Sequence, residues 1–254
     1  DRKLLKNNGF KNIENHYVEK LNNTGLVFNE SLVGTELIDK LSNKWSEYCQ
    51  DKEMPRDFRL QLSSENNLNI LNTDFREISD ILSNDIKVII QEFYQCYLNL
   101  LNIHIYRNTS PSEESLDTAY GQTGNWHTDG STSESLKIFI LLSNVSDEDG
   151  PMNLLSINQT KEIFNNINFK FSSKKTNKFI DENFDATKFT GPKGKVLIAR
   201  TNQCLHRASI PKNGRTRDLL TFYVTCSSIS RKQRDLFDNC NFEQFYGPKR
   251  ILLR

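Results

Sequence analysis

The sequence predicts an antiparallel β-sandwich or barrel backed by helices, an α+β fold of mainly β character. Apolar residues recur at helical spacing through much of the first 100 residues. From residue 101 onward they alternate with polar residues, as they do in strands. Six or more strands then follow with no proline-rich linker and no internal repeat. A helical layer and a set of strands within one unit are therefore expected.

The first third of the chain carries the helical patterns. Thr35 is a plausible cap for a helix over 35–49. Its apolar face is Leu37, Leu41, Trp45 and Tyr48. A longer periodic run predicts a second helix within 74–101, and 24–33 has room for a short strand.

Strands dominate the middle of the chain. In "LNIHIYRN", the apolar residues Leu101, Ile103 and Ile105 alternate with polar ones. Strands are predicted at 101–107, 136–143, 152–156, 195–200, 204–209 and 217–226. A short helix is expected after Asn158, and 166–190 is interpreted as an insertion or lid. The whole chain, 1–254, is expected to be one domain: helical support over 1–100, the strand core over 101–227 and a C-terminal segment over 228–254.

Composition narrows the class of protein. The 254 residues contain 33 Lys plus Arg and 32 Asp plus Glu, a net charge of +1. That balance argues against a nucleic-acid or membrane-surface binder, which would carry clustered basic residues.

The five cysteines (49, 96, 204, 226 and 240) are widely spaced, as expected of reduced thiols in a cytoplasmic protein. No apolar run approaches the roughly 18 residues of a membrane span. No signal peptide is recognisable, and the start at Asp1 leaves the true N-terminus open.

A metal site is predicted from three residues. His127 and Asp129 are separated by one residue, so in an extended segment both side chains point to one face. His206 follows a later apolar strand. Two histidines and a carboxylate form the facial triad of non-haem Fe(II) oxygenases, which leaves coordination positions open. Taken singly, each residue has a plainer interpretation as a turn residue or a hydrogen-bonded core histidine.

An arginine near His206 would complete a 2-oxoglutarate site, because the far carboxylate of that cosubstrate suits a guanidinium fork. Asn213-Gly214 predicts a two-residue hairpin turn, which would place His206 opposite Thr221. Arg217 then lies about 13 Å from Thr221 along the strand and Arg215 about 20 Å. The spacing favours Arg217, with Arg215 as the rival and a surface ion pair as the plain alternative.

Four segments together resemble the phytanoyl-CoA dioxygenase family of Fe(II)/2-oxoglutarate oxygenases: "WHTDG", "LKIFILLSNVSDEDGPMNLLS", "GKVLIARTNQCLHRAS" and "RTRDLLTFYV". The resemblance covers about 100–227 and implies a double-stranded β-helix (jelly-roll) fold backed by helices. It implies that His127, Asp129 and His206 are the iron ligands and that Arg217 binds 2-oxoglutarate. Residues 155–158 depart from the family's Gly-Ser-His, and the helical first third matches nothing in it, so the resemblance does not transfer a substrate.

Further residues are expected around this site. Tyr106 and Thr221 are candidate contacts of 2-oxoglutarate. The candidates for the substrate pocket are Trp126, Gln122, Tyr120 and His104, with Thr123 beside them. Buried tryptophans and histidines between isoleucines more often belong to the core. The loop 107–124 and the 166–190 insertion are expected to cover the opening.

The sequence therefore predicts an Fe(II)/2-oxoglutarate-dependent dioxygenase, cytoplasmic, that hydroxylates a C–H bond of a small molecule using O₂. Desaturation, epimerisation or cyclisation with the same cofactors is an alternative, and so is a non-catalytic metal-binding jelly-roll module. No catalytic residue is predicted beyond the metal site, and no nucleic-acid or membrane partner. The oligomeric state is left open.

Overall fold

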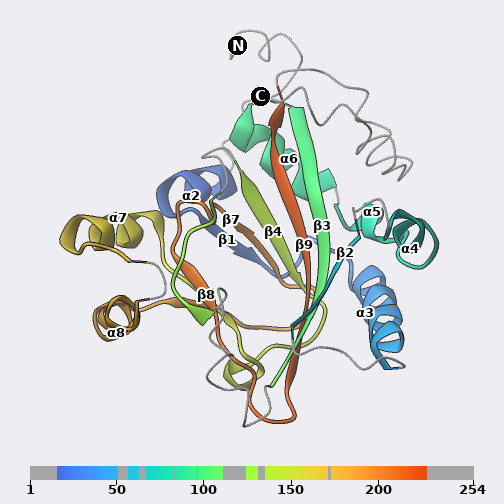
Figure 1. Cartoon of the computed structure of the whole chain (residues 1–254). Coiled ribbons are helices and arrows are strands. Elements are labelled where there is room, and N and C mark those ends of the chain that lie inside the picture. Colours follow the sequence, from blue (N-terminus) through green and yellow to red (C-terminus); the bar gives the residue numbers. More distant parts are fainter. Residues whose placement is uncertain are drawn as a thin grey trace.

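Two antiparallel sheets form the centre of the molecule, and helices pack on the outer side of each (Figure 1). The computed structural model describes residues 16–50, 57–62, 67–82, 84–95, 97–110, 124–130, 135–170 and 173–227. The helices are α2 (His16–Thr24), α3 (Thr35–Gln50), α4 (Leu68–Thr73), α5 (Ile78–Ile81), α6 (Asn84–Tyr94), α7 (Ile157–Asn166) and α8 (Lys174–Asn183). The strands are β1 (Leu26–Asn29), β2 (Asp57–Gln61), β3 (Tyr97–Thr109), β4 (Leu136–Leu141), β5 (Met152–Leu154), β6 (Thr187–Phe189), β7 (Val196–Ala199), β8 (His206–Ala208) and β9 (Thr216–Ser227).

The larger sheet has six strands in the order β1-β7-β4-β9-β3-β2. Its centre is the long antiparallel pair of β3 and β9, in which His104 lies opposite Thr221. Thr221 also lies opposite Phe139 of β4, so these three side chains share one face. Because side chains alternate along a strand, Ile103, Ile105 and Phe222 point to the other face.

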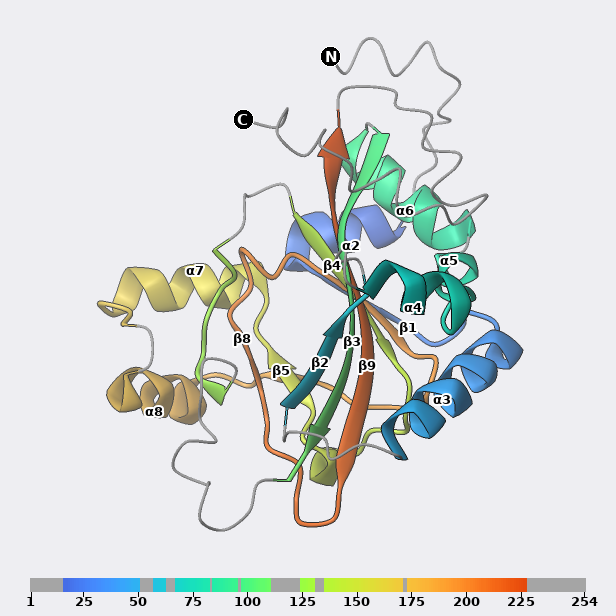
Figure 2. The same ribbon diagram turned by 45° about the vertical axis from the view of Figure 1, so that its right-hand side comes forward.

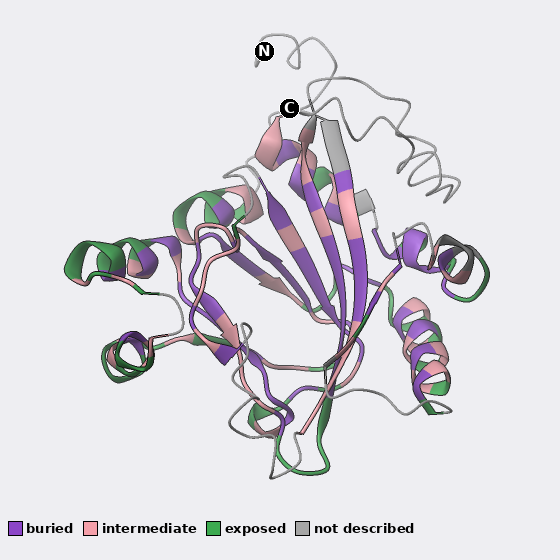
Figure 3. Ribbon diagram, viewed as in Figure 1, coloured by how far each residue is buried: buried purple, intermediate pink, exposed green. Residues whose placement is uncertain are grey.

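That other face carries the main hydrophobic core. Buried residues of α2, α3, α5 and α6 pack there against the apolar side of the sheet (Figure 3). Trp45 of α3 is fully buried and packs against the rings of Tyr48 and Phe58, which also contact each other. The helices of the first third thus cover one side of the large sheet with their apolar faces.

The smaller sheet has three strands in the order β6-β5-β8 and faces the inner side of the large one (Figure 2). A second core lies between the sheets, made of residues from both: Leu26, Phe139, Leu141, Val145, Met152, Leu154, Ile157, Phe189, Leu197, Ala199, Cys204 and Leu219. A left-handed Gly150 (φ 69°) lets the backbone at Pro211 come close, since a Cβ there would lie 2.5 Å from the Pro211 nitrogen. Two sheets with helices outside confirm the predicted α+β, jelly-roll-like fold.

The predicted hairpin between 204–209 and 217–226 is wrong. The turn itself forms, because the Arg215 amide donates to the Lys212 carbonyl at 2.9 Å. The strands on either side then separate into different sheets: β8 pairs with β5, while β9 pairs with β3 and β4. His206 therefore lies opposite Leu154 and not opposite Thr221.

The long helix predicted within 74–101 is also interrupted. It forms as α5 and α6, and β3 already begins at Tyr97. Gln95 follows α6 with φ 53°, a left-handed conformation that ends the helix. Glycine usually occupies such a position, so the sequence carries no sign of this stop. Strands β2 and β6 were not predicted either.

Within the 166–190 insertion, helix α8 lies on the outer side of the small sheet, and β6 is an edge strand of that sheet (Figure 1). Ile180 of α8 and Ile163 of α7 are buried with Trp126, Leu155 and Leu205 in a third cluster. Within the described residues, Cys49, Cys204 and Cys226 form no disulfide bond. No helix of the described chain has the length and apolar character to cross a membrane.

Candidate metal centre and cavity

His127, Asp129 and His206 meet between the two sheets. One ligand atom from each lies within 4.8 Å of the other two. In the described part of the chain, no other cluster of three His, Cys, Asp or Glu side chains has this geometry. His206 is buried, while the other two are partly exposed.

Backbone pairing holds the two histidines side by side. The His127 amide donates to the His206 carbonyl at 3.0 Å, and the His206 amide donates back at 2.9 Å. The imidazole centroids are 4.3 Å apart. The Asp129 amide donates to the Thr201 carbonyl at 3.0 Å, which fixes the third side chain against the same turn.

In each imidazole ring, Nδ1 lies within hydrogen-bonding distance of a backbone carbonyl oxygen. His127 Nδ1 lies 2.8 Å from the Asn125 carbonyl, and His206 Nδ1 lies 3.0 Å from the Cys204 carbonyl. A carbonyl only accepts, so Nδ1 carries the proton and Nε2 keeps its lone pair. Burial lowers the pKa of His206 to about 4. A neutral ring with a free Nε2 is the form that binds a metal.

Asp129 is held in its charged form. Burial alone would raise its pKa, but the charge of Lys137 and the side-chain hydrogen bonds of Lys137 and Thr201 bring the pKa below its usual value. The Lys137 ammonium lies 2.7 Å from Asp129 Oδ2, and only 12% of the Lys137 side chain is exposed. The carboxylate is thus ready to ligate, with a buried ammonium as its neighbour.

Helix α8 braces both histidine segments. Asp181 accepts a hydrogen bond from Trp126 Nε1 at 2.9 Å and forms an ion pair with Arg207 at 2.8 Å. Trp126 precedes one candidate ligand and Arg207 follows the other. Asn177 of the same helix accepts from the Trp126 amide at 3.1 Å. The predicted lid therefore supports the metal segments as well as reaching the cavity through Phe169.

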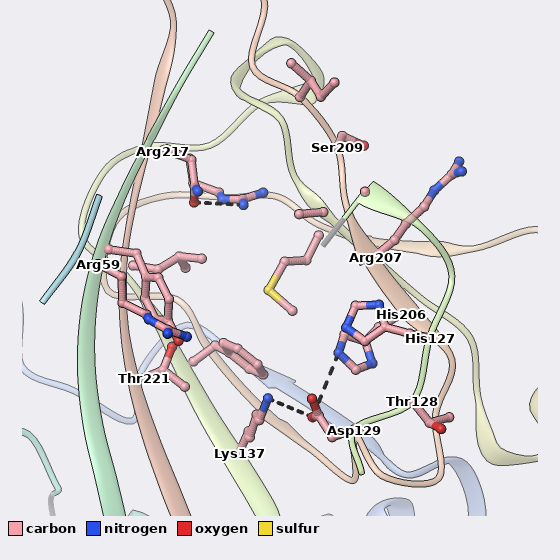
Figure 4. Close-up of a pocket in the computed structure, with 18 of the residues that line it drawn as sticks. Arg59, His127, Thr128, Asp129, Lys137, His206, Arg207, Ser209, Arg217 and Thr221 are labelled. Atoms are coloured by element: carbon pink, nitrogen blue, oxygen red, sulfur yellow. Dashed lines mark hydrogen bonds and ion pairs between the residues drawn. The ribbon is translucent and has the colours of Figure 1, made fainter. Parts of the chain in front are cut away.

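A cavity of about 590 Å³ opens in front of the three residues (Figure 4). Residues of both sheets line it, with the candidate ligands on one wall and the inner face of β3, β9 and β4 on the other. Its volume suits a small organic molecule in addition to a cosubstrate.

Arg217 stands on the wall opposite the candidate ligands (Figure 4). Its side chain is 3% exposed, and its Nη2 donates to Asn108 Oδ1 at 3.0 Å. Thr221 also lines the cavity, and its buried hydroxyl has no hydrogen-bond partner among the described residues. Arg215 instead lies on the surface, 54% exposed, with its guanidinium 3.3 Å from Glu148. The two arginines that the sequence left as rivals thus occupy different environments.

The remaining predicted residues are divided. Tyr106 lines the cavity, and its hydroxyl contacts His104 Nδ1 at 2.9 Å. His104 itself lies behind Tyr106 and does not line the cavity, and burial lowers its pKa to about 4. Trp126 is 1% exposed and belongs to the core beside α7 and α8, so its interpretation as a pocket wall is wrong. Tyr120, Gln122 and Thr123 fall outside the described residues.

Sequence reasoning missed several lining residues, among them Lys137, Tyr223 and Arg59. Lys137 gave a signal, as the one charged residue inside the apolar run "LKIFILL". Tyr223 shares strand parity with Arg217 and Thr221, which would have placed it on the same face. Arg59 gave none, because strand β2 was not predicted.

Known proteins with a similar fold are enzymes. No protein-family model and no curated protein matches the sequence. Among solved structures, the non-haem α-ketoglutarate-dependent carbocyclase SnoK from nogalamycin biosynthesis superposes with TM-score 0.59 at 12% identity, over 85% of this chain and 86% of that one. The α-ketoglutarate-dependent epimerase SnoN of the same biosynthesis gives 0.58 at 10% identity, over 89% and 84%. HygX from Streptomyces hygroscopicus, with nickel and 2-oxoglutarate bound, gives 0.57 at 14% identity, over 85% and 88%. At these identities the likeness establishes a shared fold.

Proposed function

We propose that this protein is an Fe(II)/2-oxoglutarate-dependent oxygenase that hydroxylates a C–H bond of a small molecule. One observation carries the proposal: two imidazoles and a carboxylate converge on one wall of a cavity, and a buried arginine faces them. The fold shared with SnoK, SnoN and HygX supports it.

The three side chains fit a divalent iron. Both Nε2 atoms are available as donors, because each Nδ1 is held at a carbonyl. Three protein ligands leave positions open for a cosubstrate and dioxygen. Bound there, Fe(II) and 2-oxoglutarate would supply oxidation of the substrate by O₂, with release of succinate and CO₂.

The opposite wall fits the cosubstrate. Arg217 would hold the far carboxylate of 2-oxoglutarate, oriented by Asn108 through the bond at Nη2. The unpartnered hydroxyl of Thr221 lies four residues along β9 and would donate to the same molecule. The sheet itself excludes water from this wall, since Leu219 between them is buried. These side chains orient the cosubstrate, and the chain's own part in the reaction is geometry and exclusion of water.

A second outcome with the same cofactors has specific support. SnoN is an epimerase and SnoK a carbocyclase, so enzymes with this fold also catalyse outcomes other than hydroxylation. We place the chain within the phytanoyl-CoA dioxygenase branch on its motifs alone. Hydroxylation remains our first proposal, and the same three ligands would serve an epimerisation or a cyclisation.

The test is an anaerobic titration of Fe(II) and then 2-oxoglutarate into metal-free protein, followed by the weak visible charge-transfer band of the chelate. We expect the band in the wild type. In Arg217→Gln, half-maximal absorbance should require roughly 10–100 times more 2-oxoglutarate, because a charge-assisted hydrogen bond contributes about 1.5–3 kcal/mol.

Arg215→Gln is the matched control, since it removes a nearby exposed guanidinium from the same strand region. It should titrate like the wild type. The absence of a band despite one bound iron per chain would refute the cosubstrate assignment. Equal effects of the two substitutions would refute the role of Arg217.

A further inference from the structure

Four neighbouring strands present a row of polar side chains to the cavity. Lys137 of β4 lies opposite Tyr223 of β9, with its ammonium 4.4 Å from the Tyr223 ring centroid. The Tyr223 hydroxyl lies 3.1 Å from that of Tyr106 on β3. Tyr106 lies opposite Arg59 of β2. We call Arg59, Tyr106, Tyr223 and Lys137 the cationic row; all four line the cavity.

The cavity holds more positive than negative charge. Its described lining includes four cationic side chains, Arg59, Lys137, Arg207 and Arg217, and one carboxylate, Asp129. Arg207 is neutralised by Asp181 through its ion pair. Arg59 has no carboxylate within ion-pair distance among the described residues, and Lys137 has only Asp129.

Binding of a divalent metal and 2-oxoglutarate, as proposed above, would leave the excess of positive charge unchanged. The two charges of a divalent metal and those of 2-oxoglutarate cancel, and Arg217 balances Asp129. Since Asp129 would then serve the metal, Lys137 and Arg59 would be the two charges without a counter-ion. A cationic substrate would be repelled there, and a neutral one would leave an ammonium that is 12% exposed without a partner.

The row also offers the hydrogen bonds that an anion needs. Burial raises the pKa of Tyr106 and of Tyr223, so both phenols stay protonated, and the hydrogen bond between the two hydroxyls uses one of their two protons. Two cations thus flank a linked pair of hydroxyl groups on one inner surface. Tyr223 and Lys137 lie six positions along β9 from Arg217, about 20 Å at 3.3 Å per residue, whereas Tyr106 and Arg59 lie level with Leu219, two positions from Arg217. The Lys137 end of the row can therefore serve a different molecule from Arg217.

We propose that the cationic row binds an anionic group, a carboxylate or a phosphate, of the primary substrate. The inference rests on the proposed function for what occupies the Arg217 side of the cavity. It names the substrate class: a small molecule with a negative charge placed so that the rest of it faces the candidate metal ligands.

The test uses three probes that differ only in charge: 4-fluorophenylacetate, its neutral amide, and the cationic 4-fluorophenethylamine. Their dissociation constants are measured by ¹⁹F line broadening on protein loaded with Ni(II) and 2-oxoglutarate, and again on metal-free protein. We expect the carboxylate to bind about tenfold more tightly than the amide, and the amine most weakly. Arg59→Gln should reduce the affinity of the carboxylate about tenfold and leave that of the amide unchanged.

Lys137→Gln is the second variant, tested after its metal content is confirmed, because Lys137 contacts Asp129. Arg215→Gln is the control outside the cavity and should change none of the three constants. The proposal is overturned if the carboxylate binds no better than the amide, including the case in which neither binds.

The 2-oxoglutarate affinity of each variant separates the two proposals. If Arg59→Gln weakens 2-oxoglutarate tenfold and spares the fluorinated carboxylate, the row belongs to the cosubstrate and this inference fails while the oxygenase proposal stands. If the wild type binds no 2-oxoglutarate, the oxygenase proposal fails, and the probe series on metal-free protein still decides on the anion site.

Discussion

The two walls of the cavity are built in different ways. On one side, Arg217, Thr221 and Tyr223 stand on β9, a strand of 12 residues that is paired along most of its length with β3. On the other side, His206 begins a strand of three residues, and His127 pairs with it as an isolated bridge.

The source of rigidity differs accordingly. The large-sheet wall is fixed by strand register and by the hydrophobic core on the reverse of the same strands. The metal-side wall depends on a few polar contacts, several of which come from α8 in the insertion. Variants of the large-sheet wall should therefore change what binds there. Variants of the metal-side wall should change the shape of the site.

The largest expected effect is the loss of a candidate ligand. In His206→Gln we expect Ni(II) affinity, measured by isothermal titration calorimetry, to fall roughly 1,000-fold, because losing only an outer-shell partner already costs 10–100-fold. His16→Gln, a substitution of an exposed histidine, should retain wild-type affinity. Wild-type affinity in His206→Gln would show that the metal does not use this wall.

A second prediction concerns the free energy of unfolding as a function of pH. His104 on β3, which contacts Tyr106 without lining the cavity, and His206 on the metal-side wall both have pKa values lowered to about 4, chiefly by burial. Between pH 6.5 and 4 the unfolded chain takes up a proton at each histidine and the folded chain does not. Stability of the metal-free protein should therefore fall as the pH falls through this window.

Each histidine contributes about 3 kcal/mol to that loss, because a pKa lowered from 6.5 to about 4 is worth about 1.36 kcal/mol per pH unit. His104→Gln should make the dependence flatter by that amount in urea unfolding at pH 6.5 and pH 4, without altering Ni(II) affinity. His206→Gln should flatten it equally and lower Ni(II) affinity roughly 1,000-fold. A His104→Gln curve parallel to the wild type would mean that His104 titrates normally in the fold.

How much of each wall was predictable follows from the same difference. The prediction that Arg217 and Thr221 share one face of β9 was correct, because the alternation of side chains along a strand does not depend on which strand it pairs with. The strand predicted to pair with β9 was wrong. The turn between β8 and β9 forms, but β8 belongs to the small sheet. Nothing in Asn213-Gly214 distinguishes a tight hairpin from a crossing between sheets.

For the metal-side wall, the candidate ligands could be predicted from the sequence, but the side chains that hold their segments in place could not. The spacing of His127 and Asp129 and one later histidine are local features that survive any error in topology. Asp181 and Asn177 contact Trp126 across about fifty residues of sequence, and only the folded insertion brings them there. The same long-range packing placed Trp126 in the core rather than in the pocket.

The smallest predicted effect tests that support directly. Asp181→Asn keeps an oxygen that can accept from Trp126 Nε1, but it removes the charge that holds Arg207. We expect Ni(II) affinity to fall about tenfold, since an outer contact acts on the ligands only through their orientation. Glu182→Gln is the matched control on the same helix, because its carboxylate is 59% exposed and pairs only with Lys178 at 3.6 Å.

A second measurement on Asp181→Asn, its affinity for 2-oxoglutarate, tests whether the two walls are held independently. Once Asp181→Asn is saturated with Ni(II), its 2-oxoglutarate affinity should stay within about twofold of wild type, because Arg217 and Thr221 stand on a strand that α8 does not brace. An equal loss of both affinities would mean that the walls move together. In that case the insertion would position the whole cavity, and the long strands would not by themselves fix the cosubstrate side.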